Sequence, residues 1–165
     1  MRYIYKILGI SVVIMAISCA GTKDYVFEQN PPFTVSQAYF QKWVAGVQGG
    51  GSGTNLHITL SNIKEDITIE EMFFGDKIAK ANKNPQNVDL YSANFLNDTN
   101  RDIIMDGNAI KEAKNKIPKV SPFILSENEV VLSYSLKGDV YYYKISNLIE
   151  KPIIAYPGSN PNGEN

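Results

Sequence analysis

Hydrophobic and polar residues alternate along most of the chain with a period of two, the spacing typical of β-strands buried on one face. The clearest case places Leu56, Ile58 and Leu60 on one face and His57 and Thr59 on the other. Segments with the same alternation, or with a concentration of β-favouring residues, are 39–47, 67–73, 88–96, 130–136 and 140–145. We expect each of these segments to form a strand.

Glycine-containing turns separate several of these strands. Gln48–Thr54 joins the first two and predicts a hairpin with a wide glycine-rich loop. Gly75-Asp76 and Lys137-Gly138-Asp139 predict tight turns between later strands. We therefore predict an all-β fold, a single antiparallel β-sandwich domain over residues 33–155, with a barrel as the alternative and an immunoglobulin-like topology as one candidate arrangement.

Three segments differ from this pattern. Asn108 and Pro118 bracket a short predicted helix over 109–116. Residues 20–32 are polar and contain two prolines, which indicates a spacer, although Tyr25–Phe27 could instead be a first edge strand. Residues 156–165 are rich in Pro, Gly and Asn and predict a flexible tail.

The first 18 residues have the composition of a secretory signal. They contain Arg2 and Lys6, no acidic residue, and an apolar run from Ile7 to Ile17. That run is shorter than the roughly 20 residues that a membrane-spanning helix needs. A basic start, a short apolar centre and small residues at the end predict a helical signal peptide over 1–18.

The end of this signal resembles the lipobox of bacterial lipoproteins. Ala16-Ile17-Ser18 leads directly into Cys19, the only cysteine of the chain, and Ala16 stands where the usual lipobox has Leu. The resemblance implies that Cys19 carries lipid, that residues 19–32 form the lipidated cysteine and tether, and that the protein is anchored in the bacterial cell envelope, at the outer membrane. The alternative is an ordinary cleaved signal with a cysteine nearby.

Further pieces of the chain resemble small, uncharacterised lipoproteins of Bacteroidota. They are Trp43-Val44-Ala45-Gly46-Val47-Gln48-Gly49-Gly50-Gly51-Ser52-Gly53, Val131-Leu132-Ser133-Tyr134 and Ile149-Glu150-Lys151-Pro152 before Tyr156-Pro157. This resemblance implies an envelope lipoprotein and carries no known activity, so it assigns no functional residue beyond Cys19.

The net charge of the chain limits the classes of partner that we expect. Removal of Arg2 and Lys6 with the signal would change the formal net charge from −1 to −3. A mildly acidic domain lacks the basic surface that binds phosphate backbones, so we expect no nucleic-acid partner. The expected partners are the membrane, through the N-terminal lipid, and an envelope protein or glycan.

The chain offers few candidates for catalysis or metal binding. His57 is the only histidine, lies on the polar face of its strand and has no acidic neighbour in sequence, so we expect a solvent-facing residue. We predict no catalytic residue, no metal and no cofactor. Asp98, Asn100 and Asp102 superficially resemble the start of a calcium loop, but Ile103 occupies the position that requires Gly. A looser cation site and a polar loop both stay open.

Two groups of residues are candidates for ligand binding. Gly50 and Ser52 belong to the glycine-rich loop, whose backbone amides could face a ligand carboxylate; a flexible hairpin tip is the alternative. Trp43, with Tyr39 and the Tyr141-Tyr142-Tyr143 run, could form an aromatic platform for a glycan or peptide, and alternation places Tyr141 and Tyr143 on one face; cross-strand packing is the alternative.

These features favour a membrane-anchored, non-catalytic binding or accessory module. A small envelope hydrolase is the alternative, using carboxylates such as Asp98, Asp102 or Asp106. A structural or inhibitory role toward an envelope partner is a third hypothesis.

Overall fold

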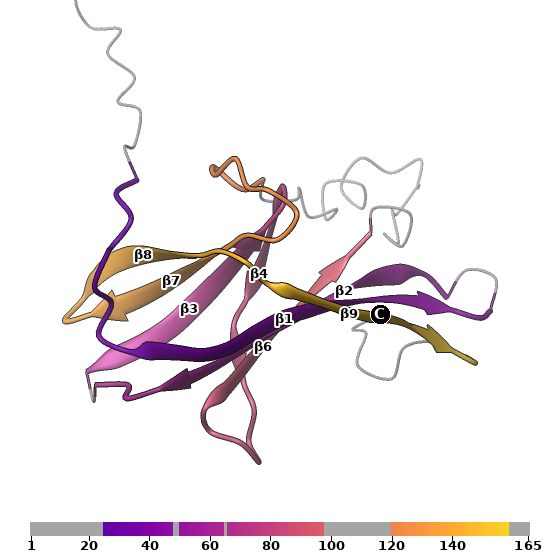
Figure 1. Cartoon of the computed structure of the whole chain (residues 1–165), viewed down its shortest axis with the longest axis horizontal. Coiled ribbons are helices and arrows are strands. Elements are labelled where there is room, and N and C mark those ends of the chain that lie inside the picture. The colour runs from indigo at the N-terminus through magenta and orange to yellow at the C-terminus, as the bar shows by residue number, and fades with distance from the viewer. Residues whose placement is uncertain (1–24, 48–49, 65, 98–119, 159–165) are drawn as a thin grey trace, which may run out of the picture.

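The computed structural model describes residues 25–47, 50–64, 66–97 and 120–158. These residues form nine strands and no helix, and the strands make two sheets that pack face to face (Figure 1). One sheet holds β1 (Thr34–Ala45), β2 (Ser52–Ser61), β5 (Asn82–Lys83), β6 (Leu90–Leu96) and β9 (Ile149–Tyr156). The other holds β3 (Ile67–Phe74), β4 (Lys77–Lys80), β7 (Val130–Leu136) and β8 (Asp139–Ile145). The prediction of an all-β sandwich is confirmed.

The order of the strands is that of an immunoglobulin-like sandwich. The five-stranded sheet reads β5-β6-β2-β1-β9 and the four-stranded sheet reads β4-β3-β7-β8. When β1 to β8 are lettered A, B, C, C′, D, E, F and G in chain order, the sheets become D-E-B-A and C′-C-F-G, with β9 added beside A. This is the immunoglobulin-like arrangement.

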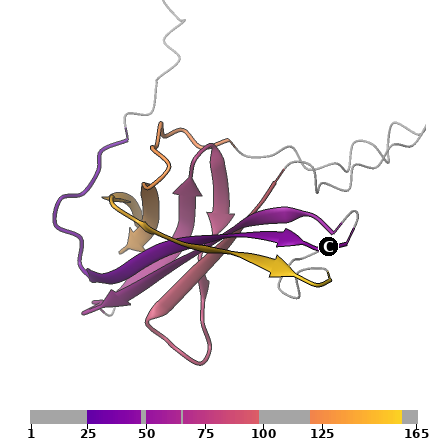
Figure 2. The same ribbon diagram turned by 45° about the vertical axis from the view of Figure 1, so that its right-hand side comes forward.

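The ninth strand was not predicted. It lies along the free edge of β1 and pairs with it in parallel, so the five-stranded sheet is mixed and not purely antiparallel (Figure 2). Pro152 lies within β9 and has no N–H to donate, which suits an edge strand. The pairing register shifts between Gln41 and Trp43, and the Gln41 side chain donates a hydrogen bond of 2.7 Å to the Pro152 carbonyl. Because β9 includes Tyr156, the packed domain extends beyond the predicted boundary at 155.

The main core lies between the two sheets, where the period-two pattern places it. Leu56, Ile58 and Leu60 of β2 are all 0% exposed, and each such side chain stabilises the fold by about 1.5–3 kcal/mol. The other buried members of this core are Phe33, Phe40, Ile69, Met72, Ala81, Tyr91, Ala93, Phe95, Val130, Leu132, Tyr134, Ile145 and Leu148.

A second apolar cluster covers the outer face of the four-stranded sheet. Its buried members are Phe73, Phe123 and Val131. Phe27 forms a parallel bridge with Tyr142 of β8, and the Glu28 N–H donates a hydrogen bond of 2.8 Å to the Tyr142 carbonyl. The packed part of the chain therefore starts before the predicted boundary at residue 33.

Several predictions fall on residues that the structure does not describe. They concern the signal peptide over 1–18, Cys19, the helix over 109–116, and Asp98, Asn100, Asp102 and Asp106. Within the described residues, no helix is long and apolar enough to cross a membrane.

Candidate functional site

The structure does not bring the predicted ligand-binding residues together. Trp43 and Ser52 lie in β1 and β2, and Gly50 lies in the loop between these strands. Tyr141 and Tyr143 lie in β8, which belongs to the opposite sheet. These residues therefore form no common platform.

Tyr141 and Tyr143 pack against the core, as the packing interpretation expected. The Tyr141 ring stacks on Tyr134, with ring centroids 5.6 Å apart and an interplanar angle of 20°. Tyr143 meets Phe33 edge to face at 5.8 Å. Both tyrosines are partly buried, so their rings contribute cross-strand packing at the rim of the sandwich.

Trp43 is on the outer face of the five-stranded sheet, and its side chain is only 3% exposed. Its indole lies against Gly53 of β2, where an added Cβ would come within 2.9 Å of the Trp43 Nε1 atom. The Tyr156 ring adjoins it at a centroid distance of 6.1 Å. The indole faces are therefore covered and do not offer a stacking surface.

The polar groups of the glycine-rich loop are hydrogen-bonded within the hairpin and to Asn97, which follows β6. The Gly50 N–H donates to the Val47 carbonyl at 3.0 Å, and the Gly51 carbonyl accepts from the Ala45 N–H at 2.9 Å. The Ser52 hydroxyl accepts a hydrogen bond of 2.7 Å from the Asn97 side chain. A ligand carboxylate would have to compete with these bonds.

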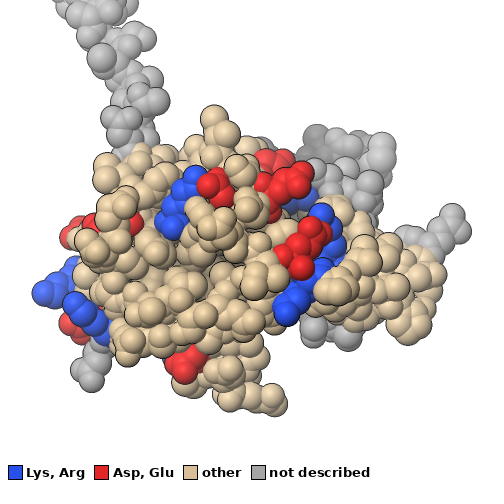
Figure 3. Space-filling model, viewed as in Figure 1, with Lys and Arg blue, Asp and Glu red and all other residues tan. Residues whose placement is uncertain are grey.

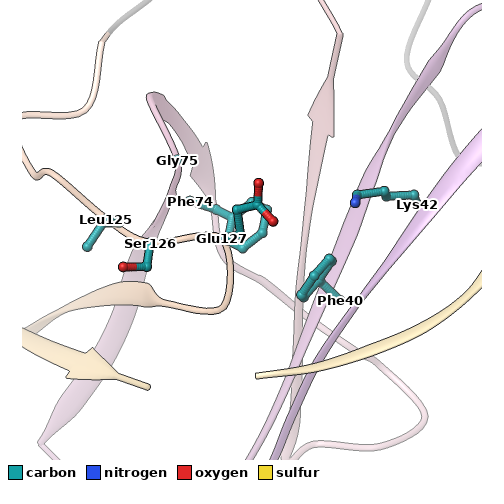
Figure 4. Close-up of a pocket in the computed structure, with 7 residues that line it drawn as sticks. All are labelled: Phe40, Lys42, Phe74, Gly75, Leu125, Ser126 and Glu127. Carbon is teal, nitrogen blue, oxygen red and sulfur yellow. The ribbon is translucent and has the colours of Figure 1, made fainter. Parts of the chain in front are cut away.

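A pocket of about 220 Å³ opens between the inner face of β1 and the end of β3 (Figure 4). Its lining consists of Phe40, Lys42, Phe74, Gly75, Leu125, Ser126 and Glu127. Phe40 and Phe74 form the floor with ring centroids 5.1 Å apart, and Phe95 lies behind Phe74 at 5.8 Å. We call this site the aromatic pocket.

The rim of the aromatic pocket carries charges of both signs. Lys42 Nζ lies 2.9 Å from Glu150 Oε1 of β9 and 5.7 Å from the centroid of the Phe40 ring. Figure 4 shows the Lys42 ammonium and the Glu127 carboxylate directed at the space between them. The hydrogen bond to Glu150 raises the pKa of Lys42, and the Glu127 charge adds to this effect. Acidic and basic side chains lie next to each other over the region of β1 and β9 (Figure 3).

The sequence contains one signal that points to this pocket. Phe40 and Lys42 are two residues apart in β1, so the strand places both side chains on the inner face. A charged side chain is rarely fully buried. A lysine among the inward-facing residues of a sandwich strand therefore indicates a place where the two sheets separate and solvent enters. Phe74 reaches the same opening because β3 ends there, and Gly75 turns the chain with φ of 58°.

His57 is half-buried and stacks on Tyr39 of β1, with ring centroids 4.9 Å apart and an interplanar angle of 22°. Burial lowers its pKa, which favours the neutral imidazole. Among the described residues, no group of three His, Cys, Asp or Glu side chains lies close enough to hold a metal ion.

Comparison of the chain with protein-family models, with curated protein sequences and with solved structures finds no match.

Proposed function

We propose that the protein is a lipid-anchored binding module of the bacterial cell envelope, and that the aromatic pocket receives a cationic, partly apolar group of its partner. The observation that carries this proposal is the pairing of an aromatic floor, Phe40 and Phe74, with a charged rim. Envelope location and lipidation rest on the sequence around Cys19.

The size of the pocket sets the size of its ligand. Pockets for drug-sized molecules usually have volumes of about 300–1,000 Å³. The aromatic pocket, at about 220 Å³, suits a single side chain or a fragment of similar size. Contact with the two phenyl rings removes apolar surface from water at about 25 cal/mol per Å².

The charges at the rim favour a cation. The pocket lining carries one ammonium, Lys42, and one carboxylate, Glu127, and Lys42 is already paired with Glu150 of β9. Glu127 is therefore the carboxylate of the lining that can face a cationic ligand. An ammonium or guanidinium group over an aromatic ring gains a further 0.5–2 kcal/mol, roughly. A lysine or arginine side chain of an envelope protein has this combination of an apolar stem and a cationic head.

Three small probes with one body and different charges test this proposal. 2-Phenylethylamine, 2-phenylethanol and 3-phenylpropionate carry a positive, neutral and negative head, and their binding is followed by the NMR shifts of the Phe40 and Phe74 rings. We expect the amine to bind most tightly and Glu127→Gln to weaken it several-fold. The matched control is Glu70→Gln, because Glu70 is an exposed carboxylate on β3 outside the pocket. Equal binding of the three probes, or loss of affinity in both variants, would reject the proposal.

The anchor is tested separately through Cys19. Cells producing the wild type and Cys19→Ser are lysed and partitioned between detergent and aqueous phases. We expect the wild type in the detergent phase, because two or more acyl chains give stable membrane attachment. The Cys19→Ser chain should move to the aqueous phase, and its retention with detergent would contradict lipidation at this residue.

A further inference from the structure

Three buried polar atoms on the outer face of the five-stranded sheet have no hydrogen-bond partner among the described residues. They are Trp43 Nε1, Asn55 Oδ1 and His57 Nδ1. Trp43 and Asn55 are only 3% and 8% exposed. In native proteins more than about 90% of buried polar groups are paired, and each unpaired one costs about 1–3 kcal/mol. Three such atoms together require an explanation.

The three side chains share the outer face of β1 and β2, with Trp43 on β1 and Asn55 and His57 on β2, and we call them the outer-face row. The Trp43 indole rests against Gly53, and Asn55 and His57 follow at intervals of two residues on the same face. Residues two apart in a strand are separated by roughly 6.6 Å, so the backbone positions Gly53, Asn55 and His57 span roughly 13 Å.

The neighbours on β1 do not supply the missing bonds. Gln41 of β1 is the cross-strand partner of Asn55, but its side-chain amide donates to the Pro152 carbonyl. Tyr39 is the cross-strand partner of His57 and meets it through a ring stack. The row is thus packed against β1, and these two β1 side chains give no hydrogen bond to its three buried polar atoms.

The chemistry of the row selects the class of ligand. An indole N–H requires an acceptor, whereas the Asn55 carbonyl oxygen requires a donor. A carboxylate or phosphate would oppose the Asn55 oxygen, and an ammonium would oppose the indole N–H. A hydroxyl group both donates and accepts, so a neutral molecule with several hydroxyls meets both requirements.

We propose that the outer-face row is a binding site for a neutral polyhydroxylated ligand of the carbohydrate class. Such a ligand would approach from the end formed by Tyr39 and His57, where both rings are partly exposed. Its hydroxyls would meet the Asn55 carbonyl oxygen and the Trp43 N–H. This site is independent of the aromatic pocket, which lies on the inner face of β1.

The single tryptophan makes this proposal directly measurable. Trp43 gives the only indole N–H signal of the chain, and this signal is followed in ¹H–¹⁵N spectra of the full-length protein in detergent. The probes are glucose, N-acetylglucosamine and cellobiose, added up to about 100 mM. We expect a saturable shift of the indole signal with at least one of these sugars.

Two variants remove one polar group each and keep the shape of the site. Asn55→Leu removes the acceptor, and His57→Phe removes the ring nitrogens while it preserves a ring against Tyr39. We expect each to weaken sugar binding about tenfold, as loss of a buried hydrogen bond does. The control is Thr68→Val on β3, an exposed position in the opposite sheet.

The same spectra distinguish the proposal from its alternative. Cross-peaks between the Trp43 N–H and water, with no response to any sugar, would show that ordered water fills the row and would overturn the proposal. A sugar response that persists in both Asn55→Leu and His57→Phe would place the sugar elsewhere and would also overturn it.

Discussion

The indole of Trp43 and the backbone of Gly53 face each other across β1 and β2, and the contact leaves no room for a side chain on Gly53. A Cβ at this position would come within 2.6 Å of the Phe95 carbonyl oxygen and 2.9 Å of Trp43 Nε1. The glycine is thus required by the close approach of two neighbouring strands.

Gly53→Ala should therefore destabilise the fold. We expect the free energy of unfolding, measured by urea denaturation, to fall by about 1–3 kcal/mol because overpacking forces the backbone to shift. Gly158→Ala is the matched control, since a Cβ there meets nothing within 4 Å. Equal unfolding midpoints for Gly53→Ala and the wild type would contradict the contact described.

Ile58 should be among the most sensitive positions of the core. Its side chain is 0% exposed between the sheets, so Ile58→Ala removes buried methyl groups and leaves a cavity. We expect a loss of about 2–5 kcal/mol in the free energy of unfolding. Ile124→Ala, at a fully exposed isoleucine, should change stability by less than about 0.5 kcal/mol. Similar losses in the two variants would be inconsistent with this core.

Glu129 should contribute stability that is lost in acid. Its carboxylate lies 2.8 Å from Lys144 Nζ and accepts a hydrogen bond from the Ser126 N–H. The bond to Lys144 lowers the pKa of Glu129 in the folded state. The contribution is therefore complete above the unfolded-state pKa and disappears as the pH falls through the lower, folded-state value.

Urea unfolding of Glu129→Gln tests this pH dependence. The variant should be less stable than the wild type at pH 7, and the difference should shrink toward about pH 3, where the wild-type carboxyl is protonated in the unfolded chain. Glu70→Gln provides the comparison at an exposed carboxylate. A difference that is constant with pH would count against an ionic role for Glu129.

His57 should make folding less favourable as the solution becomes acidic. Burial lowers its pKa in the folded state, so the unfolded chain binds a proton more readily. Stability should decline as the pH falls below about 6.5, the unfolded-state value, and should level off below the folded-state value. His57 is the only histidine, so His57→Phe should remove this slope between pH 7 and about pH 5.5. An unchanged slope in His57→Phe would assign it to another group.

Much of the fold could be predicted from the alternation of side chains. Leu56, Ile58 and Leu60 face the core as the sequence indicates, and the turns at Gly75 and Gly138 have the positive φ values that glycine accommodates. β9 could not be recognised in this way. It pairs on one side only, contains Pro152 and exposes Ile149 and Ile153, so its pattern lacks a buried face.

The candidate site was harder to predict because it depends on which strands meet. Tyr141 and Tyr143 share a face of β8, as alternation requires. The sequence does not reveal that this face is the inner face of the four-stranded sheet, whereas Trp43 belongs to the five-stranded sheet. The aromatic pocket likewise joins Phe40 to Phe74, which are brought together only by the packing of the two sheets. Lys42 on the inward side of β1 was the one local indication of this opening.

With a lipid on Cys19, as we propose, the attachment of Tyr25 and Phe27 to the four-stranded sheet would limit how far the domain can stand from a membrane. Tyr25 meets Phe123 at a ring-centroid distance of 4.9 Å, and only six peptide units separate it from Cys19. A fully extended segment of six peptide units spans roughly 20 Å at most. This length is similar to the radius of gyration of about 14 Å for a domain of this size. A domain acylated at Cys19 would therefore lie close to the lipid headgroups. It would meet its partners by lateral diffusion in the plane of the membrane.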